Sequence, residues 1–173
     1  MNKLLVKLGM TMVLALGLTA CAPQKVTPWG YQTDFDTAPG LVEHDFQRLS
    51  TSLTEDMLTY PWLEGYKQRH QSAPTIHIGE IDNLTGEPLD TAAFKQAFEQ
   101  ALINSGQVKL IGDNKSQADF VLSGKILLEL EQTEVERKAT YNLEWALTNQ
   151  HTSADVWAAR NQVQKNQRMR PLQ

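Results

Sequence analysis

The histidines are the side chains best suited to catalysis or metal binding, and their spacing argues against both uses. None of the four lies at a metal-ligand spacing from another: His44, His70, His77 and His151. His77 falls on an expected strand near Glu80 and Asp82, so a metal or acid–base site there is the alternative to a surface histidine. The sequence also has no nucleophile elbow, phosphate loop or paired-carboxylate motif. We therefore expect no enzyme activity, no metal and no cofactor.

Four glutamates form a second group with chemical potential: Glu129, Glu131, Glu134 and Glu136. A clustered acid–base site is one interpretation. Glu129 and Glu131 lie two positions apart on an expected strand, and the other two glutamates follow in an expected hairpin. A period of two places side chains on the same side of a strand. The pattern therefore favours a solvated face and hairpin.

The single cysteine has the surroundings of a lipid-attachment site. A basic start with Lys3 and Lys7 is followed by an apolar run over residues 8–18, too short to span a membrane but typical of a signal peptide. The run ends in Leu18-Thr19-Ala20-Cys21, which resembles the bacterial lipobox. We expect residues 1–20 to be a signal peptide, cleaved between Ala20 and Cys21, and the Cys21 thiol to accept the lipid. The alternative is a lone thiol beside an ordinary cleavage site.

The residues after Cys21 indicate where such a lipoprotein resides. Ala22 stands where an aspartate commonly retains lipoproteins in the inner membrane, so we expect an outer-membrane anchor with three acyl chains, facing the periplasm. Residues 21–41 are rich in proline and glycine and predict a flexible tether. Without Lys3 and Lys7, the chain keeps 14 basic and 20 acidic residues, a net charge of −6. This charge argues against binding to nucleic acid.

The remaining chain predicts a single periplasmic α+β domain over residues 42–165. Apolar residues at helical spacing predict a helix over residues 42–57, and Asp90 or Thr91 caps a second helix that ends at Gly106. Residues 75–82, 108–111, 118–131, 138–149 and 156–163 alternate as strands. We therefore expect a mixed or antiparallel sheet of about four to five strands, covered on one face by two helices.

Two segments have no regular element in this prediction. Residues 60–74 are expected to form a long irregular connection, in which Trp62 is either a partner anchor or folded back onto the helices. Residues 166–173 are expected to form a basic C-terminal tail. Together with Lys165, its Arg168 and Arg170 either contact an anionic partner or fray into solvent.

Several stretches carry a family resemblance. They comprise the helix at residues 46–58, the strand and turn at 76–85, the segment 89–91 with the helix that follows it to 101–108, and the strands at 118–124 and 155–157. In these stretches the chain resembles the LpoB family of outer-membrane lipoproteins, which activate penicillin-binding proteins.

The resemblance implies a regulatory function in cell-wall synthesis. It implies a protein that binds and activates a class A penicillin-binding protein, a bifunctional peptidoglycan synthase. The alternative is a structural lipoprotein subunit of another envelope assembly, of the secretion or flagellar-basal type, because a fold alone does not determine function. A partner would contact the solvated sheet face around Lys125, Glu129 and Glu144, or the segment around Trp62, because the helices must bury their apolar sides.

Overall fold

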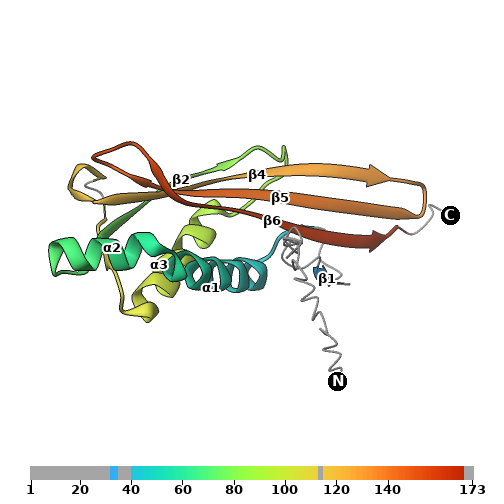
Figure 1. The fold of residues 1–173 in the computed structure, drawn as a ribbon. Helices are drawn as coiled ribbons and strands as arrows, with labels where there is room; N and C mark the ends of the chain where they lie inside the picture. Colours follow the sequence, from blue (N-terminus) through green and yellow to red (C-terminus); the bar gives the residue numbers. More distant parts are fainter. Residues whose placement is uncertain (1–31, 35–39, 113–114, 170–173) are drawn as a thin grey trace, which may run out of the picture.

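The computed structural model describes residues 32–34, 40–112 and 115–169. They form one sheet with helices on one face (Figure 1). The expected α+β fold is therefore confirmed. The expected signal peptide, Cys21, most of the tether and the last four residues lie outside the described residues. Within the described part of the chain, no helix is long and apolar enough to cross a membrane.

The first helical segment is longer than the sequence pattern predicts. Helix α1 (Glu43–Thr59) begins where Asp45 accepts a hydrogen bond from the Val42 N–H at 3.0 Å, and its Phe46 and Met57 are buried. After Tyr60 the chain continues as helix α2 (Pro61–His70). The prediction of an irregular connection over residues 60–74 was therefore wrong. Proline is favoured at the first position of a helix, where its missing N–H costs no intrahelical bond, so Pro61 begins α2 instead of only ending α1.

The third helix has the predicted boundaries. The Asp90 carboxylate caps α3 (Thr91–Ser105) by accepting a hydrogen bond from the Ala93 N–H at 2.8 Å. Gly106 ends α3 with a φ of 63°, in the left-handed region that glycine enters without steric cost. The helix buries Phe94, Phe98 and Leu102 against the sheet.

The sheet combines an antiparallel meander with parallel strands. Its order is β1-β6-β5-β4-β2-β3. The four long strands are β2 (Thr75–Asn83), β4 (Phe120–Gln132), β5 (Glu136–Asn149) and β6 (Asp155–Arg168); the short ones are β1 (Gln32–Asp34) and β3 (Lys109–Leu110). Strands β4, β5 and β6 are antiparallel, whereas β2 is parallel to β3 and β4. A 3₁₀ helix, Lys115–Gln117, precedes β4.

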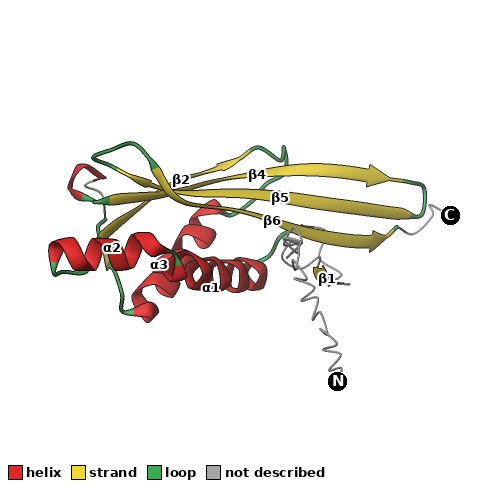
Figure 2. Ribbon diagram, viewed as in Figure 1, coloured by secondary structure: helices red, strands yellow, loops and turns green. Residues whose placement is uncertain are grey.

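All three helices lie on the same side of the sheet (Figure 2). We call this side the helix face and the opposite side the outer face. As alternation predicts, the inward residues of β5 are buried: Ala139, Tyr141, Leu143, Trp145 and Leu147. The indole of Trp145 packs at ring-centroid distances of 5.1 Å from Phe94 and 4.7 Å from Phe98. It also lies over Gly124, where an added Cβ would approach the ring within 2.2 Å, so the close packing requires glycine.

The C-terminal end of the domain differs from the predicted tail. Strand β6 extends through Arg168, and Lys165 is buried on the helix face. The Lys165 ammonium lies 2.8 Å from the Asp45 carboxylate, and both side chains are 1% exposed. Of the two alternatives given for the basic end, fraying is wrong for Lys165 and Arg168, because pairing with β5 and this buried ion pair hold the strand.

The N-terminal boundary of the folded unit also differs from residue 42. Leu41 belongs to the hydrophobic core, and β1 pairs in parallel with Val163–Lys165 of β6. Two parts of the expected tether are therefore packed on the domain.

Candidate partner-docking surface

Cross-strand rows of side chains organise the outer face. The best-defined charged row joins β4, β5 and β6 through register pairs Lys125–Glu144 and Glu144–Arg160. The Lys125 ammonium lies 2.8 Å from one Glu144 oxygen, and the Arg160 Nε lies 3.3 Å from the other. Opposite charges directly across a sheet attract, so Glu144 fixes both cations in place.

The two cations also act on the ionisation of Glu144. The hydrogen bond from Lys125 is the main cause that lowers the pKa of the Glu144 carboxyl; burial opposes this effect, and the charges of Lys125 and Arg160 reinforce it. Glu144 therefore stays ionised at neutral and mildly acidic pH. Arg160 is 84% exposed and Lys125 48% exposed. The row thus presents two solvent-accessible cations, Lys125 and Arg160, that are both held by the Glu144 carboxylate.

The next row along the strands is made of amides and leucines. The Gln162 amide donates to the Asn142 side-chain oxygen at 2.8 Å, and the Asn142 amide donates to the Glu129 carboxylate at 3.1 Å. Glu129 therefore lies four residues further along β4 than Lys125, on the same face, and is connected to β6 through Asn142. These hydrogen bonds connect the three strands. The Asn142 amide is uncharged, so it does not neutralise the charge of Glu129.

Two exposed leucines lie at the other end of this row. Leu127 of β4 is opposite Asn142 in the register and is 36% exposed. The Leu84 N–H donates to the Ile126 carbonyl at 2.9 Å, which continues the parallel register of β2 and β4 and places Leu84 opposite Leu127. Leu84 is 58% exposed. An exposed apolar pair bordered by charged and amide groups is the usual composition of a protein-binding patch.

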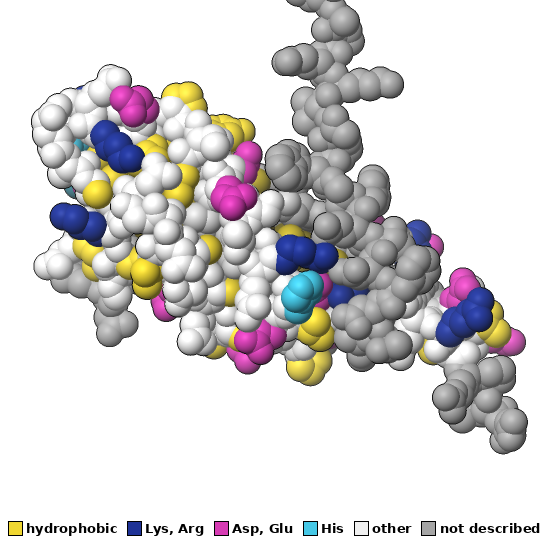
Figure 3. All heavy atoms as spheres, turned by 90° about the horizontal axis from the view of Figure 1, so that it is seen from below, with side chains coloured by type: hydrophobic (Ala, Val, Ile, Leu, Met, Phe, Trp, Pro, Cys, Tyr) yellow, Lys and Arg dark blue, Asp and Glu magenta, His cyan; other side chains and the backbone are white. Residues whose placement is uncertain are grey.

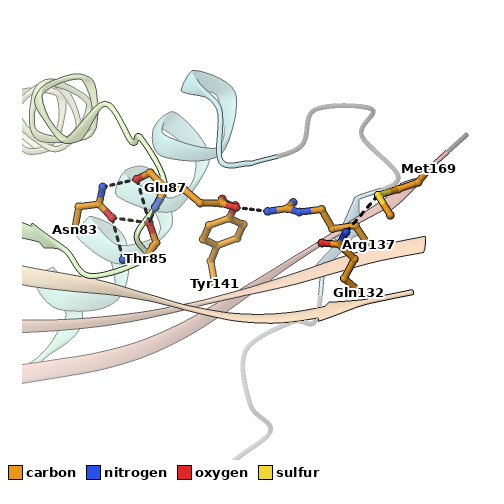
Figure 4. A network of polar contacts seen from close by, with 7 residues as sticks. All are labelled: Asn83, Thr85, Glu87, Gln132, Arg137, Tyr141 and Met169. Atoms are coloured by element: carbon orange, nitrogen blue, oxygen red, sulfur yellow. Dashed lines mark hydrogen bonds and ion pairs between the residues drawn. The ribbon is translucent and has the colours of Figure 1, made fainter. Parts of the chain in front are cut away.

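A polar network holds the loop that carries Leu84 (Figure 4). The Asn83 side chain accepts from the Thr85 hydroxyl at 2.7 Å and donates to the Glu87 carbonyl at 2.8 Å. Such an Asx-type turn gives the loop a defined conformation. It continues into Gly86, whose φ of 76° lies in the left-handed region.

The carboxylate of Glu87 fastens the same loop to β5. It accepts a hydrogen bond from the Tyr141 hydroxyl at 2.8 Å and forms an ion pair with Arg137. Burial raises the pKa of Tyr141 to about 12, and the Glu87 carboxylate adds to this shift while Arg137 opposes it. Tyr141 is fully buried, so its hydroxyl needs this partner. Leu84 is therefore presented on a braced loop.

A shallow depression of about 280 Å³ lies beside the charged row. Small residues from three strands form its floor, namely Ser123, Ala146 and Ala158, and Lys125, Glu144 and Arg160 border it. We define the docking surface as the charged row, the leucine pair and this depression.

The structure brings together three of the four partner-binding residues expected from the sequence. Lys125, Glu129 and Glu144 lie on the outer face, as alternation predicts. Trp62 does not: it is 9% exposed, packs at 4.8 Å from the Phe120 ring on the helix face, and donates its indole N–H to the Met57 carbonyl at 2.8 Å. Trp62 is a core residue, and its assignment to the docking surface is withdrawn.

Leu84, Leu127 and Arg160 were not among the partner-binding residues predicted from the sequence. Alternation along residues 118–131 places Leu127 on the same face as Lys125, but nothing in the sequence pattern distinguishes an exposed leucine from a covered one. Arg160 could have been predicted from the sequence. It lies in a polar segment between Trp157 and Val163, and alternation from these two buried residues places it on the outer face. The pairing of Leu84 with Leu127 depends on a parallel register that no local pattern reveals.

The helix face offers less to a charged partner. It shows scattered charges among uncharged side chains (Figure 3). Two depressions of about 340 and 440 Å³ between α1 and α3 are lined mainly by amides, hydroxyls and alanines. Two of the amides are already bonded within their own helices, Gln47 to Glu43 and Gln100 to Asn104.

The histidine considered as a metal or acid–base group is engaged with the backbone. His77 Nδ1 lies 2.7 Å from the Gly112 carbonyl, which sets its orientation. In the described ranges, no three histidine, aspartate or glutamate side chains are grouped to hold a metal ion.

Comparison with known proteins finds one family model that matches part of the chain. The model of the family described as peptidoglycan-synthase activator LpoB matches residues 45–118. No curated protein sequence matches the chain.

Solved structures match over a larger part of the chain. The LpoB C-terminal domain from Salmonella enterica matches with a TM-score of 0.51 at 13% identity, and that from Escherichia coli with 0.50 at 14%; each match covers 69% of this chain and 98% of the other. At these identities the structures show a shared fold. With the family match, they confirm the resemblance to LpoB that the sequence predicts.

Proposed function

We propose that this LpoB-like protein is an outer-membrane lipoprotein that binds a class A penicillin-binding protein and stimulates its synthesis of peptidoglycan. The family match over residues 45–118 is the observation that carries the proposal. It spans the helix layer, β2, β3 and the loop that presents Leu84. The matched family acts as an activator of a peptidoglycan synthase, and we extend this role to the present chain.

The docking surface is the part of the described structure that best suits such a partner. The helix face must bury its apolar residues against the sheet, whereas the outer face leaves Leu84 and Leu127 in solvent beside charged groups. In a protein interface, a few well-placed anchors supply most of the binding energy and the surrounding contacts exclude water. We assign the anchor role to the leucine pair and the orienting role to Lys125, Glu144 and Arg160.

The membrane anchor is part of the same proposal. Lipid on Cys21 would hold the protein at the outer membrane, facing the periplasm. Residues 22–31, which precede the paired strand β1, would give it reach. Ten fully extended residues span at most about 35 Å. A synthase in the inner membrane must therefore project into the periplasm to meet the domain.

The direct test uses the mature chain with Cys21→Ala, so that no lipid is attached, and the host's own class A synthase. We expect binding in a pull-down and a faster rate of lipid II polymerisation or crosslinking when the protein is added. The protein alone should leave peptidoglycan unchanged. If the synthase neither binds nor responds, the activator function is excluded, and a structural role in another envelope assembly becomes the better explanation.

A matched pair of variants tests the docking surface. Leu127→Ser should weaken synthase binding about tenfold, which corresponds to about 1.4 kcal/mol. Ile103→Ser is the control, because Ile103 is 60% exposed on α3, away from the outer face. Both variants should melt close to the unaltered protein, since neither side chain belongs to the core. Equal affinities for the two variants would place the contact elsewhere.

A further inference from the structure

Within the described part of the chain, much of one side of the β6 backbone has no strand partner. In the sheet order β6 lies between β5 and β1, and β1 pairs only with Val163–Lys165. Among the described residues, no strand pairs with residues 155–162 of β6 on the side away from β5. Alternate N–H and C=O groups over these eight residues therefore face outward. Such groups can pair with another extended chain.

Proteins usually protect a long strand edge. Proline, inward charges, bulges, or a covering segment are the common means. The β2 edge has two of them, a register irregularity between Ile78 and Ile81 and the short strand β3. Residues 155–162 of β6 contain no proline, and they pair regularly with β5 from Trp157 onward. Strand β6 also has a register irregularity, between Asp155 and Trp157, but among the described residues none of these protecting features lies between Trp157 and Gln162.

The same edge already accepts an extended segment. Residues Gln32–Asp34 of the chain itself add to β6 as a parallel strand at Val163–Lys165. The backbone conformation of β6 is therefore suited to strand addition next to the open stretch. A strand from another protein would continue the sheet beyond β6 and extend the outer face by one strand.

The charged row specifies the chemistry of the added strand. Across the sheet the row reads Asp82, Lys125, Glu144 and Arg160, so its charges alternate from β2 to β6. Arg160 ends the row, is 84% exposed, and shares Glu144 with Lys125. A carboxylate on the next strand would continue the alternation and pair with the free side of Arg160.

We infer that residues 155–162 of β6 bind an extended segment of the partner protein by strand addition, and that this segment carries an acidic residue opposite Arg160. The inference rests on the proposed function, because the partner is taken to be the class A synthase. It adds the mode of binding and the chemistry of the bound segment.

Two adjacent alanines allow a test of the backbone contact. Ala158 and Ala159 pair regularly with Ala146 and Trp145, so the N–H of one donates toward β5 and that of the other points to the open edge. Proline in place of the alanine whose N–H donates toward β5 should unfold or strongly destabilise the domain. Proline in place of the alanine whose N–H points to the open edge should be tolerated. We expect that tolerated variant, either Ala158→Pro or Ala159→Pro, to keep its fold and lose synthase binding at least tenfold.

Hydrogen exchange at single-residue resolution gives a second measurement on the unaltered protein. Addition of the synthase should protect every second amide within residues 155–162, namely those that point away from β5. Docking on a face protects no such alternating set. Arg160→Glu should weaken binding more than Arg160→Gln, because the first change repels an acidic residue and the second only removes the attraction.

The outcomes separate the two proposals. If the unaltered protein does not bind the synthase, both are overturned. If it binds, but the folded proline variant binds equally and the β6 amides stay unprotected, the strand-addition inference alone fails. Sedimentation that shows a dimer of the protein alone, lost in the folded proline variant, would assign the edge to a second copy and overturn the partner-strand inference.

Discussion

The buried ion pair between Asp45 and Lys165 allows a quantitative test of the structure. It joins the first turn of α1 to the end of β6 at 2.8 Å, with both side chains 1% exposed. Lys165→Met keeps a side chain of similar length but leaves the Asp45 carboxylate buried without its main cation. Removing one partner of a buried pair typically costs about 3–5 kcal/mol. For a domain of this size, that is a large share of a stability of about 5–15 kcal/mol.

The matched control is Lys138→Met. Lys138 pairs with Glu131 at 3.4 Å, but the two side chains are 42% and 75% exposed, so its loss should cost about 0–1 kcal/mol. Urea unfolding monitored by circular dichroism measures both variants. A cost of about 3–5 kcal/mol corresponds to a fall in melting temperature of roughly 10–20 °C for a domain of this size.

A double variant checks the physical reason. Asp45→Asn together with Lys165→Met removes both charges, so most of the lost stability should return, apart from the weakened cap of α1. If Lys165→Met unfolds within 1 kcal/mol of Lys138→Met, Lys165 is solvated and the end of β6 is frayed, as the sequence alone predicts.

Three further outcomes are expected. Gly124→Ala should destabilise the domain by about 1–3 kcal/mol in thermal melts, because its Cβ would meet the Trp145 ring; Gly112→Ala, with nothing within 4 Å, is the neutral control. The raised pKa of Tyr141, about 12 against 10 in the unfolded chain, adds stability that is complete below pH 10 and lost as pH rises toward 12. Urea midpoints at pH 9 to 11 should therefore fall more for the unaltered protein than for Tyr141→Phe. Cys21→Ser should abolish labelling by a fatty-acid analogue, and continued labelling would contradict the lipid assignment.

Local patterns in the sequence determined most of the elements. Asp90 and Gly106 mark the ends of α3 because a carboxylate cap and a left-handed glycine act through the nearest backbone groups. The alternation from Ala139 to Leu147 identifies the buried side of β5 for the same reason, since a period of two is a property of a single strand. The predicted lipid-attachment motif ending at Cys21 is likewise contiguous, so its prediction does not depend on the fold.

The tertiary structure decided the features that depend on distant partners. Trp62 is aromatic and falls after a proline, which suits a loop anchor as well as a core residue; only the neighbouring Phe120 and the Met57 carbonyl make it a core residue. In the sequence, Lys165 resembles part of a basic tail. In the structure it is buried, because it forms an ion pair with Asp45, which lies 120 positions earlier in the chain.

The docking surface shows the same division. Alternation placed Lys125, Glu129 and Glu144 on one face, because each needs only its own strand to define its side. The approach of Leu84 to Leu127, the reach of Arg160 to Glu144 and the open edge of β6 all follow from strand order and register. Register is set by packing of the whole sheet against its helices, and that energy is not contained in any single segment of the sequence.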